Sequence, residues 1–206
     1  MEQQAAFQQH SRDHPIINIS GEQIALGPLR HELLPHYLRW RNDLYLMRTF
    51  GDVPRPVTAE ARERWFEDVT TSDEAILFTI YERASWRPIG MTNLFDLDER
   101  HRSCAFGMMI GEADCRGRGY GAETAHLMLD YAFTSLALHS VHLDVDEFNL
   151  AGRRAYAKAG FREVGRLREA TWLAGQWWDL IQMDCLAHEF VSPVLGRMFA
   201  PDQPRA

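Results

Sequence analysis

The chain has 206 residues, which is enough for one domain with its own core and short for two. Its 29 acidic residues outnumber its 22 basic ones, and this balance argues against nucleic acid or an anionic membrane as a partner, since both repel negative charge. A cationic ligand suits it better, although net charge does not describe any one pocket.

The cysteines and the N-terminus indicate a reducing compartment. Cys104, Cys115 and Cys185 are odd in number and show no CxxC spacing, so we expect free thiols rather than disulfides or a metal site. The N-terminal residues are polar and lack the apolar core of a signal peptide, and no stretch approaches the length of a membrane span. The sequence therefore predicts a cytoplasmic protein without a membrane partner.

One domain accounts for the chain. Residues 1–14 and 201–206 are predicted to be flexible tails around a domain at 15–200, because no linker, repeat or low-complexity segment interrupts it.

The first half of the domain is predicted to begin with a strand at 23–29 and a helix at 31–48, which is entered or interrupted near Pro35. A second helix begins at the N-cap Thr58. Three strands follow at 75–81, 88–95 and 103–111, and the last two form an antiparallel hairpin.

The second half continues this mixed pattern of helices and strands. A glycine-rich segment leads into a helix with one apolar face, and an alternating strand at 141–146 follows. Asn149 is expected to cap the next helix and Gly160 to end it. The chain then predicts a hairpin that turns near Ala174 and Gly175. The apolar face of the glycine-led helix consists of Ala125, Met128, Leu129, Ala132, Phe133 and Leu136.

The segment CRGRGYGAE, residues 115–123, is typical of an anion site. Loose backbone before a helix leaves amide N–H groups unpaired at the positive end of the helix dipole, and such groups bind phosphate. A Walker loop would need Gly-Lys-Ser/Thr, and a dinucleotide fingerprint would need GxGxxG after the first strand of a βαβ unit. Arg116, Gly119 and Gly121 instead match Arg/Gln-x-x-Gly-x-Gly/Ala. A flexible turn with a helix cap is the alternative interpretation.

A second constellation lies in NLAGRRAYAKAGF, residues 149–161. Asn149, Gly152, Arg153 and Tyr156 follow the spacing i, i+3, i+4 and i+7, so they share one face of the predicted helix. A plain surface stripe is the alternative for these residues. The order of the elements is harder to explain by chance: a phosphate loop is followed by a helix, an acidic strand, an Asn-capped helix and a Gly-Phe end.

With these two motifs, the chain resembles the GNAT superfamily of acyl-CoA-dependent N-acetyltransferases from about residue 20 to 187. RGRGYGAE and DEFNLAGRRAYAKAGF carry most of the resemblance. The second half looks most like the branch that acetylates polyamines and ribosomal protein N-termini, and the short stretch RWRND, residues 39–43, looks like relatives that act on amino sugars. The resemblance implies an α/β fold of the α+β type, with a mixed, mostly antiparallel sheet whose fourth and fifth strands splay.

The resemblance also implies a site for the cosubstrate acetyl-CoA. The pantetheine arm would lie between the splayed strands, held by the side chain of Asn149, and Arg153 would reach the 3′-phosphate or face solvent. The arm would pair with backbone at Met109, Ile110 and Gly111. The pyrophosphate would bind amides of Arg116, Gly117, Arg118, Gly119, Tyr120 and Gly121.

By the same resemblance Tyr156 is the general acid that protonates the leaving thiolate of CoA, because a phenol with a pKa of about 10 can donate that proton. Many relatives have a glutamate base on the fourth strand, but residues 104–107 contain no carboxylate. Asp144, Asp146 or Glu147 could act through water, and a solvated strand face is the alternative for each. Cys104 is expected to be a small buried thiol rather than an acylated one.

The predicted activity is transfer of acetyl from acetyl-CoA to a primary amine of a small molecule or peptide. A nucleotide-linked amino sugar is the rival acceptor, because arginines on the first helix could bind its diphosphate, and a non-catalytic acyl-CoA sensor is the rival function. A homodimer that pairs through the late hairpin is a further expectation. The candidates for the acceptor pocket are Trp40, Asn42, Asp43, Phe50, Trp65, Trp172 and Trp178.

Overall fold

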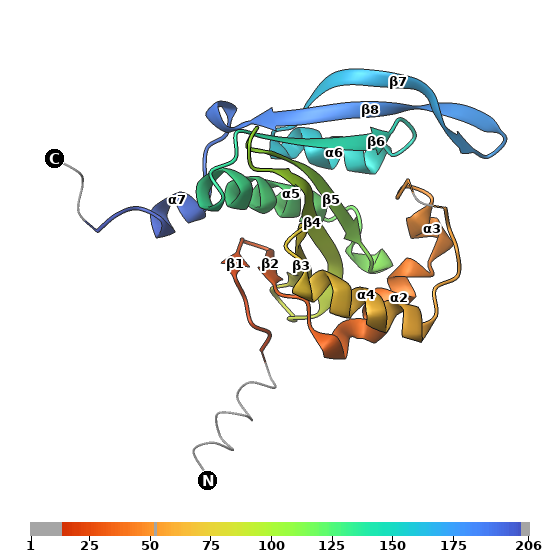
Figure 1. Cartoon of the computed structure of the whole chain (residues 1–206), viewed down its shortest axis with the longest axis horizontal. Helices are drawn as coiled ribbons and strands as arrows, with labels where there is room; N and C mark the ends of the chain where they lie inside the picture. The colour runs from red at the N-terminus through yellow and green to blue at the C-terminus, as the bar shows by residue number, and fades with distance from the viewer. Residues whose placement is uncertain (1–13, 52, 203–206) are drawn as a thin grey trace, which may run out of the picture.

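In the part of the chain that the structure describes, residues 14–51 and 53–202, eight strands form one sheet (Figure 1). The structure is a computed structural model. The strand order is β1-β2-β3-β4-β5-β6-β8-β7, and all neighbours are antiparallel except the parallel pair β5 and β6. The strands are β1 (Ile19–Ser20), β2 (Ile24–Gly27), β3 (Ala75–Glu82), β4 (Pro88–Asp98), β5 (Ser103–Ile110), β6 (Ser140–Asp146), β7 (Arg162–Leu173) and β8 (Gln176–Leu186). The predicted mixed, mostly antiparallel α/β fold is confirmed.

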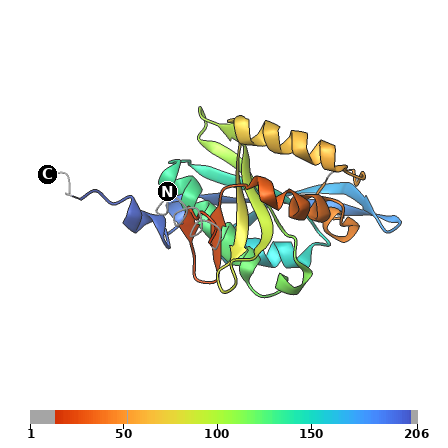
Figure 2. The same cartoon turned by 90° about the horizontal axis from the view of Figure 1, so that it is seen from below.

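Helices cover the two faces of the sheet separately. Figure 2 shows α2 and α4 on one side of the strands and α6 on the other. Helix α5 packs against α6 and β5, so it belongs to the α6 side. The helices are η1 (His31–Leu33), α2 (Leu34–Arg41), α3 (Leu44–Met47), α4 (Ala59–Thr71), η2 (Ala113–Cys115), α5 (Tyr120–Asp130), the π-helical turn η3 (Tyr131–Ser135), α6 (Leu150–Ala159), η4 (Ala187–Glu189) and α7 (Leu195–Met198).

The strands β5 and β6 separate after a short parallel contact. Their pairing runs from Ser103 opposite Ser140 to Ala105 opposite His142, and it includes no later residue of either strand. The rest of β5 stays paired with β4 alone. Because the side of β5 that faces β6 then lacks a partner strand, its backbone groups are available to a ligand. This confirms the predicted splay of the fourth and fifth strands of the fold.

The predicted helix ends agree with the capping contacts. Thr58 Oγ1 accepts a hydrogen bond from Ala61 N at 3.2 Å at the start of α4. Asn149 Oδ1 accepts from Gly152 N at 3.0 Å at the start of α6. Gly160 ends α6 with a φ of 115°, a left-handed conformation that a residue without a Cβ adopts at little cost.

The helix predicted over residues 31–48 is divided into α2 and α3. Pro35 marks the start of α2, as expected, because proline fits the first helical turn. The division after Arg41 was not predicted. Asn42 exchanges hydrogen bonds with both backbone groups of Val57 at 2.9 Å, and Asp43 accepts from Tyr45 N at 2.9 Å. These side chains compete with helix continuation and begin α3 in a new direction.

Two apolar clusters lie on opposite faces of the sheet. The larger contains the inward residues of β5 and β6 together with the apolar face of α5, including Phe106, Met128 and Val141. The smaller lies under α2 and α4 and is built on Tyr37 and Trp40. The three cysteines are free and buried, which confirms the thiols predicted from their number and spacing.

Asp130 holds the C-terminal helix to the body of the molecule. Its carboxylate is fully buried and accepts from Val194 N at 3.0 Å, Leu195 N at 2.8 Å and Thr134 Oγ1 at 2.8 Å. We expect Asp130→Ala to lower the free energy of unfolding by about 2–3 kcal/mol, because buried donors lose their acceptor. Urea unfolding of this variant and of the exposed control Asp68→Ala measures the difference, and equal midpoints would contradict the prediction.

None of the described helices is long and apolar enough to cross a membrane. The tail predicted for residues 1–14 lies outside the described residues except for His14, and residues 203–206 of the predicted C-terminal tail also lie outside them.

Candidate active site

One cavity of about 410 Å³ lies where the end of β5, the glycine segment, α6 and the end of α3 meet. It brings together eight of the twelve residues that the sequence predicted as site residues: Met109, Ile110, Arg116, Gly117, Gly119, Gly121, Asn149 and Tyr156. The other lining residues are Tyr45, Leu46, Arg48, Thr49, Phe50, Met108, Cys115, Ala122, Ala151, Gly152, Arg154, Ala155 and Lys158.

The glycine segment presents unpaired amides to this cavity. Gly117 and Gly119 have φ values of 74° and 92°, in the left-handed region where glycine is favoured. No side chain caps the start of α5, and its first backbone bond runs from Glu123 N to Gly119 O at 3.1 Å. The amides of the first turn, before Glu123, therefore have no helical acceptor, and they point where an anion can bind.

Arg116 ties this segment to the end of β5. Its Nε donates to Ile110 O at 3.2 Å and its Nη2 to Gly111 O at 3.0 Å. The guanidinium also lies over the Tyr45 ring, 5.2 Å from the centroid. The side chain of Arg116 thus links the end of β5 to the unpaired amides of the glycine segment, a role that the sequence pattern did not reveal.

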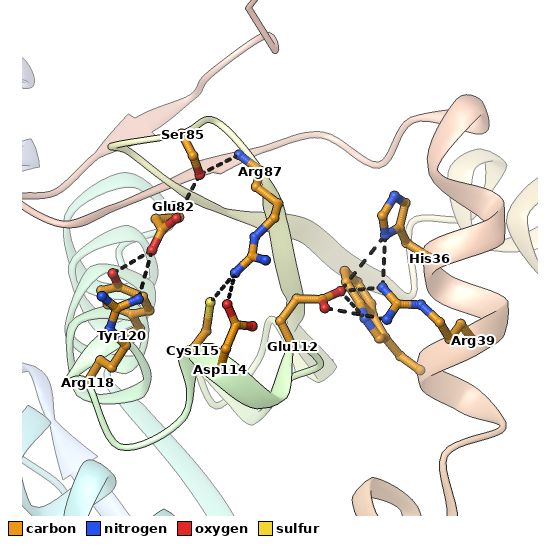
Figure 3. A network of polar contacts seen from close by, with 11 residues as sticks. His36, Arg39, Glu82, Ser85, Arg87, Glu112, Asp114, Cys115, Arg118 and Tyr120 are labelled. Carbon is orange, nitrogen blue, oxygen red and sulfur yellow. Dashed lines mark hydrogen bonds and ion pairs between the residues drawn. The ribbon is translucent and has the colours of Figure 1, made fainter.

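Polar contacts fix both flanks of the segment (Figure 3). Glu112 binds Arg39 and accepts from Trp40 Nε1 at 2.9 Å. Burial acts to raise the pKa of Glu112, but the bonds from Arg39 and Trp40 outweigh it and hold the pKa below its usual value. Arg87 Nη2 donates to Asp114 Oδ2 at 2.7 Å and to Cys115 Sγ at 3.0 Å. The η2 turn is therefore anchored to both α2 and the start of β4.

Two predicted residues of the segment point away from the cavity. Tyr120 donates to Glu82 Oε1 at 2.8 Å and Arg118 Nη1 lies 3.3 Å from the same oxygen (Figure 3). The bond to Glu82 is the main cause that raises the pKa of Tyr120. Neither side chain lines the cavity. Any contribution of these two residues to anion binding comes from their backbone amides.

Gly111 also lies outside the cavity lining, although its neighbours Met109 and Ile110 are part of it. Its amide donates to Ile89 O at 2.8 Å, and a Cβ added at this position would lie 2.4 Å from the Trp40 ring. Glycine is therefore required at position 111 for close packing against α2.

Helix α6 presents a slightly different face to the cavity than the spacing suggested. Asn149, Gly152 and Tyr156 line it, but Arg153 turns aside, donating to Glu147 O at 3.4 Å and lying 3.5 Å from Glu163. Arg154 and Lys158 line the cavity in its place, and the described residues give neither an ion-pair partner. Their spacing of four, beside small residues on the same face, is the sequence signal that could have identified them.

Tyr156 lies in an apolar wall of the cavity. It is 9% exposed, and its ring meets Phe106 and Phe161 edge-on at centroid distances of 6.0 Å. Burial raises the pKa of Tyr156 to about 12. The phenol is consequently protonated throughout the physiological range, which is the state that a proton donor needs.

The base candidates near the end of β6 do not line the cavity. Asp144 is exposed, and Glu147 pairs with Arg166 at 2.8 Å. Asp146 is buried and accepts from Thr171 Oγ1 at 2.6 Å, and burial raises its pKa despite that bond. Cys104 is fully buried with its pKa raised to about 12 by burial, so its thiol is not a ready nucleophile.

The aromatic candidates for the acceptor pocket separate into different environments. Phe50 lines the cavity. Trp40 is buried in the smaller cluster, Trp65 packs against that cluster, and Trp172 is 58% exposed on the β7–β8 hairpin. Trp178 donates to Leu173 O at 3.2 Å within the hairpin. Asn42 and Asp43 shape the break between α2 and α3, as described above.

The site combines the free edge of β5, the unpaired amides of the glycine segment with cations nearby, and the buried phenol of Tyr156. The free edge can pair with amides of an extended ligand arm, and the unpaired amides of the glycine segment can bind a diphosphate. The phenol can protonate a leaving group beside that arm. This combination suits a donor substrate with phosphates at one end and a reactive acyl group at the other.

Comparisons with known proteins identify the class. The family model described as an acetyltransferase (GNAT) domain matches residues 23–162. The spermidine N(1)-acetyltransferase of Vibrio cholerae is 30% identical over 82% of this chain and 96% of its own length. The human alpha/beta-tubulin-N-acetyltransferase 9 is 26% identical over 70% of this chain and 74% of its own. A crystal structure of the Vibrio cholerae enzyme in complex with CoA and spermine has the same fold, with a TM-score of 0.75, 24% identity, and coverage of 82% and 98% of the two chains.

The chain belongs to the GNAT acetyltransferase family. It is an acetyl-CoA-dependent N-acetyltransferase that transfers acetyl to a primary amine. The resemblance that the two sequence motifs indicated is confirmed, together with acetyl-CoA as the cosubstrate.

Proposed function

We propose that acetyl-CoA binds in the cavity with its pantetheine arm along β5 and that Tyr156 is the general acid. The observation that carries this proposal is the common cavity of the β5 end, the glycine segment and Tyr156. The arm pairs with the backbone of Met109 and Ile110, where the strand edge lacks a partner, and Asn149 Nδ2 donates to it while Oδ1 caps α6. The pyrophosphate binds the amides from Gly117 to Gly121.

In the reaction the amine nitrogen attacks the thioester carbonyl, the carbon–sulfur bond breaks, and the thiolate receives the Tyr156 proton. A backbone amide of β5 stabilises the oxyanion. The amine loses its own proton to water or through water to a carboxylate such as Asp146. No chain group forms a covalent intermediate, because burial raises the pKa of the Cys115 thiol that lines the cavity and of the Cys104 thiol on β5.

The acceptor is a small-molecule or peptide amine. The names of the relatives place a polyamine and a protein among the acceptors of this family, so both classes belong in any test.

We further propose a single domain over residues 15–200, a cytoplasmic location and a homodimer. The exposed edge strand β7 with Val164 and Leu167 supports pairing of two copies there.

The test is turnover of acetyl-CoA, measured as release of free thiol, against a panel of primary amines. The panel contains spermidine, spermine, amino acids, short peptides and amino sugars, including one linked to a nucleotide. Thiol release with one class establishes that class as the acceptor. Calorimetric binding of acetyl-CoA without any turnover would instead favour the acyl-CoA sensor, and no binding at all would overturn the proposed site.

A further inference from the structure

Arg62 is a buried cation without an anionic partner. The residue is 7% exposed and belongs to α4, on the side that faces the sheet. Its Nη2 donates to Met91 Sδ at 3.6 Å, and its Nε has no hydrogen-bond partner. The described residues provide no carboxylate that pairs with it. A buried charge of this kind is costly for folding, and the ring of Trp65 beneath it offsets that cost without supplying a hydrogen-bond acceptor.

The orientation of this guanidinium suits an anion. It lies over the Trp65 ring, 3.4 Å from the centroid, and 5.9 Å from that of Tyr37. A guanidinium stacked on a ring directs its N–H edge along the plane of the ring. That edge is the fork that binds a carboxylate or phosphate through two hydrogen bonds.

Arg62 lies close to the wall of the active-site cavity. Its sulfur partner Met91 is paired with Met109 in the register of β4 and β5, and Met109 lines the cavity. Arg62 itself does not line the cavity, so its guanidinium contacts the strand that neighbours the cavity wall, and adjacent strands are about 4.8 Å apart. Arg48 is exposed, lines the cavity directly and lies over the Tyr45 ring at 4.1 Å.

The charged side chains that line the cavity are all cationic. Arg48, Arg116, Arg154 and Lys158 line it, and none of the described lining residues is a carboxylate. Burial first, and then the neighbouring Arg41, lower the pKa of Arg62 to about 10, which leaves it charged near neutral pH. Asp43 lies 3.8 Å from Arg116, and the phosphates of CoA compensate part of this charge, but a polycation entering beside Arg48 and Arg62 is repelled by both guanidinium groups.

We propose that the acceptor carries, besides its primary amine, a carboxylate or phosphate group that binds Arg62, with Arg48 as the second cation at the mouth of the cavity. This inference rests on the proposed function, because it assigns a substrate class to the same site. The chemistry is shared by amino acids and by phosphorylated amines. It makes a free polyamine the poorer acceptor.

Matched pairs of acceptors test the proposal at saturating acetyl-CoA. The carboxylate pair is leucine and leucinamide, the phosphate pair is O-phosphoethanolamine and ethanolamine, and spermidine is the cationic reference. We expect kcat/KM for the anionic member of at least one pair to exceed that of its neutral partner by about 10- to 100-fold, as for a charged hydrogen bond. The pair that responds identifies the source of the anion. Spermidine as the best acceptor, or no turnover of either anionic member while acetyl-CoA still binds, would overturn the proposal and leave the proposed function intact.

Arg62→Met separates this role from a structural one. Methionine fills a similar volume without a charge, so the melting temperature is expected to stay equal or rise, while the preference for the anionic acceptor disappears. Arg62→Lys keeps the charge without the fork and is expected to retain part of the preference. The control Arg64→Met, at an exposed position of the same helix, is expected to change neither property. An unchanged acceptor preference in Arg62→Met would overturn the proposal, whatever its stability. If the wild-type protein does not bind acetyl-CoA at all, that result counts against the proposed function instead.

Discussion

Tyr156→Phe is expected to lower kcat by about 100-fold or more while the Kd for CoA stays nearly unchanged. The substitution removes the hydroxyl and keeps the ring that packs against Phe106 and Phe161. The leaving thiolate then lacks its proton donor, but the cavity keeps its shape. Steady-state thiol release and calorimetric titration with CoA measure the two quantities on the same preparation.

The raised pKa of Tyr156 does not prevent this role. Burial raises it to about 12, and burial also raises the pKa of the Cys104 and Cys185 thiols, to about 12 and about 11. A thiolate that forms beside Tyr156 is desolvated in the same way, so the two proton affinities remain close. Because a group with a pKa of about 12 keeps its proton well above pH 8, kcat should not fall between about pH 8 and 10 through loss of this proton.

The control for this prediction is Tyr131→Phe, which removes a partly buried phenol outside the cavity and should leave kcat unchanged. A Tyr156→Phe enzyme that retains most of its kcat would assign the acid elsewhere. A fall in kcat on the alkaline side already at about pH 8 would mean that Tyr156 titrates far below the value that its burial implies.

Most of the fold could be predicted from sequence because its signals are local. The caps at Thr58 and Asn149, the stop at Gly160 and the turn at Ala174 all act through neighbouring residues, and each occurs where expected. The division between α2 and α3 was missed because it depends on bonds between Asn42 and Val57, fifteen positions apart. Its consequence for the site is direct, since the end of α3 forms one wall of the cavity.

The site could be predicted only where backbone geometry determines it. The glycine segment and the free edge of β5 follow from motif and topology, and both are present at the cavity. The orientation of individual charged side chains does not follow from spacing alone. Glu82 draws Arg118 and Glu163 draws Arg153 away from the cavity, and these acidic residues lie outside the two motifs, on β3 and β7. Arg62 was missed for a related reason, since a buried arginine on an amphipathic helix looks like a surface residue in the sequence.

The double substitution Arg154→Gln with Lys158→Gln is expected to raise the KM for acetyl-CoA by about 10- to 100-fold with little change in kcat. Both side chains line the cavity from α6, and no ion pair within the described residues neutralises them. They can bind phosphate groups of the donor, far from the thioester carbon, so their loss weakens binding of the substrate and the transition state equally. Steady-state kinetics at saturating amine gives both constants.

Arg153→Gln is the matched control, and it also tests the assignment that the sequence suggested for the 3′-phosphate. The Arg153 guanidinium already interacts with Glu147 O and Glu163, so reaching the donor would require it to leave both partners. Acetyl-dephospho-CoA, which lacks the 3′-phosphate, identifies the group that is bound. If Arg154 and Lys158 bind that phosphate, the wild type should prefer acetyl-CoA to the dephospho form and the double variant should lose this preference. An equal preference in both would place these two cations on the pyrophosphate, and a loss of preference in Arg153→Gln alone would restore Arg153 as the ligand of the 3′-phosphate.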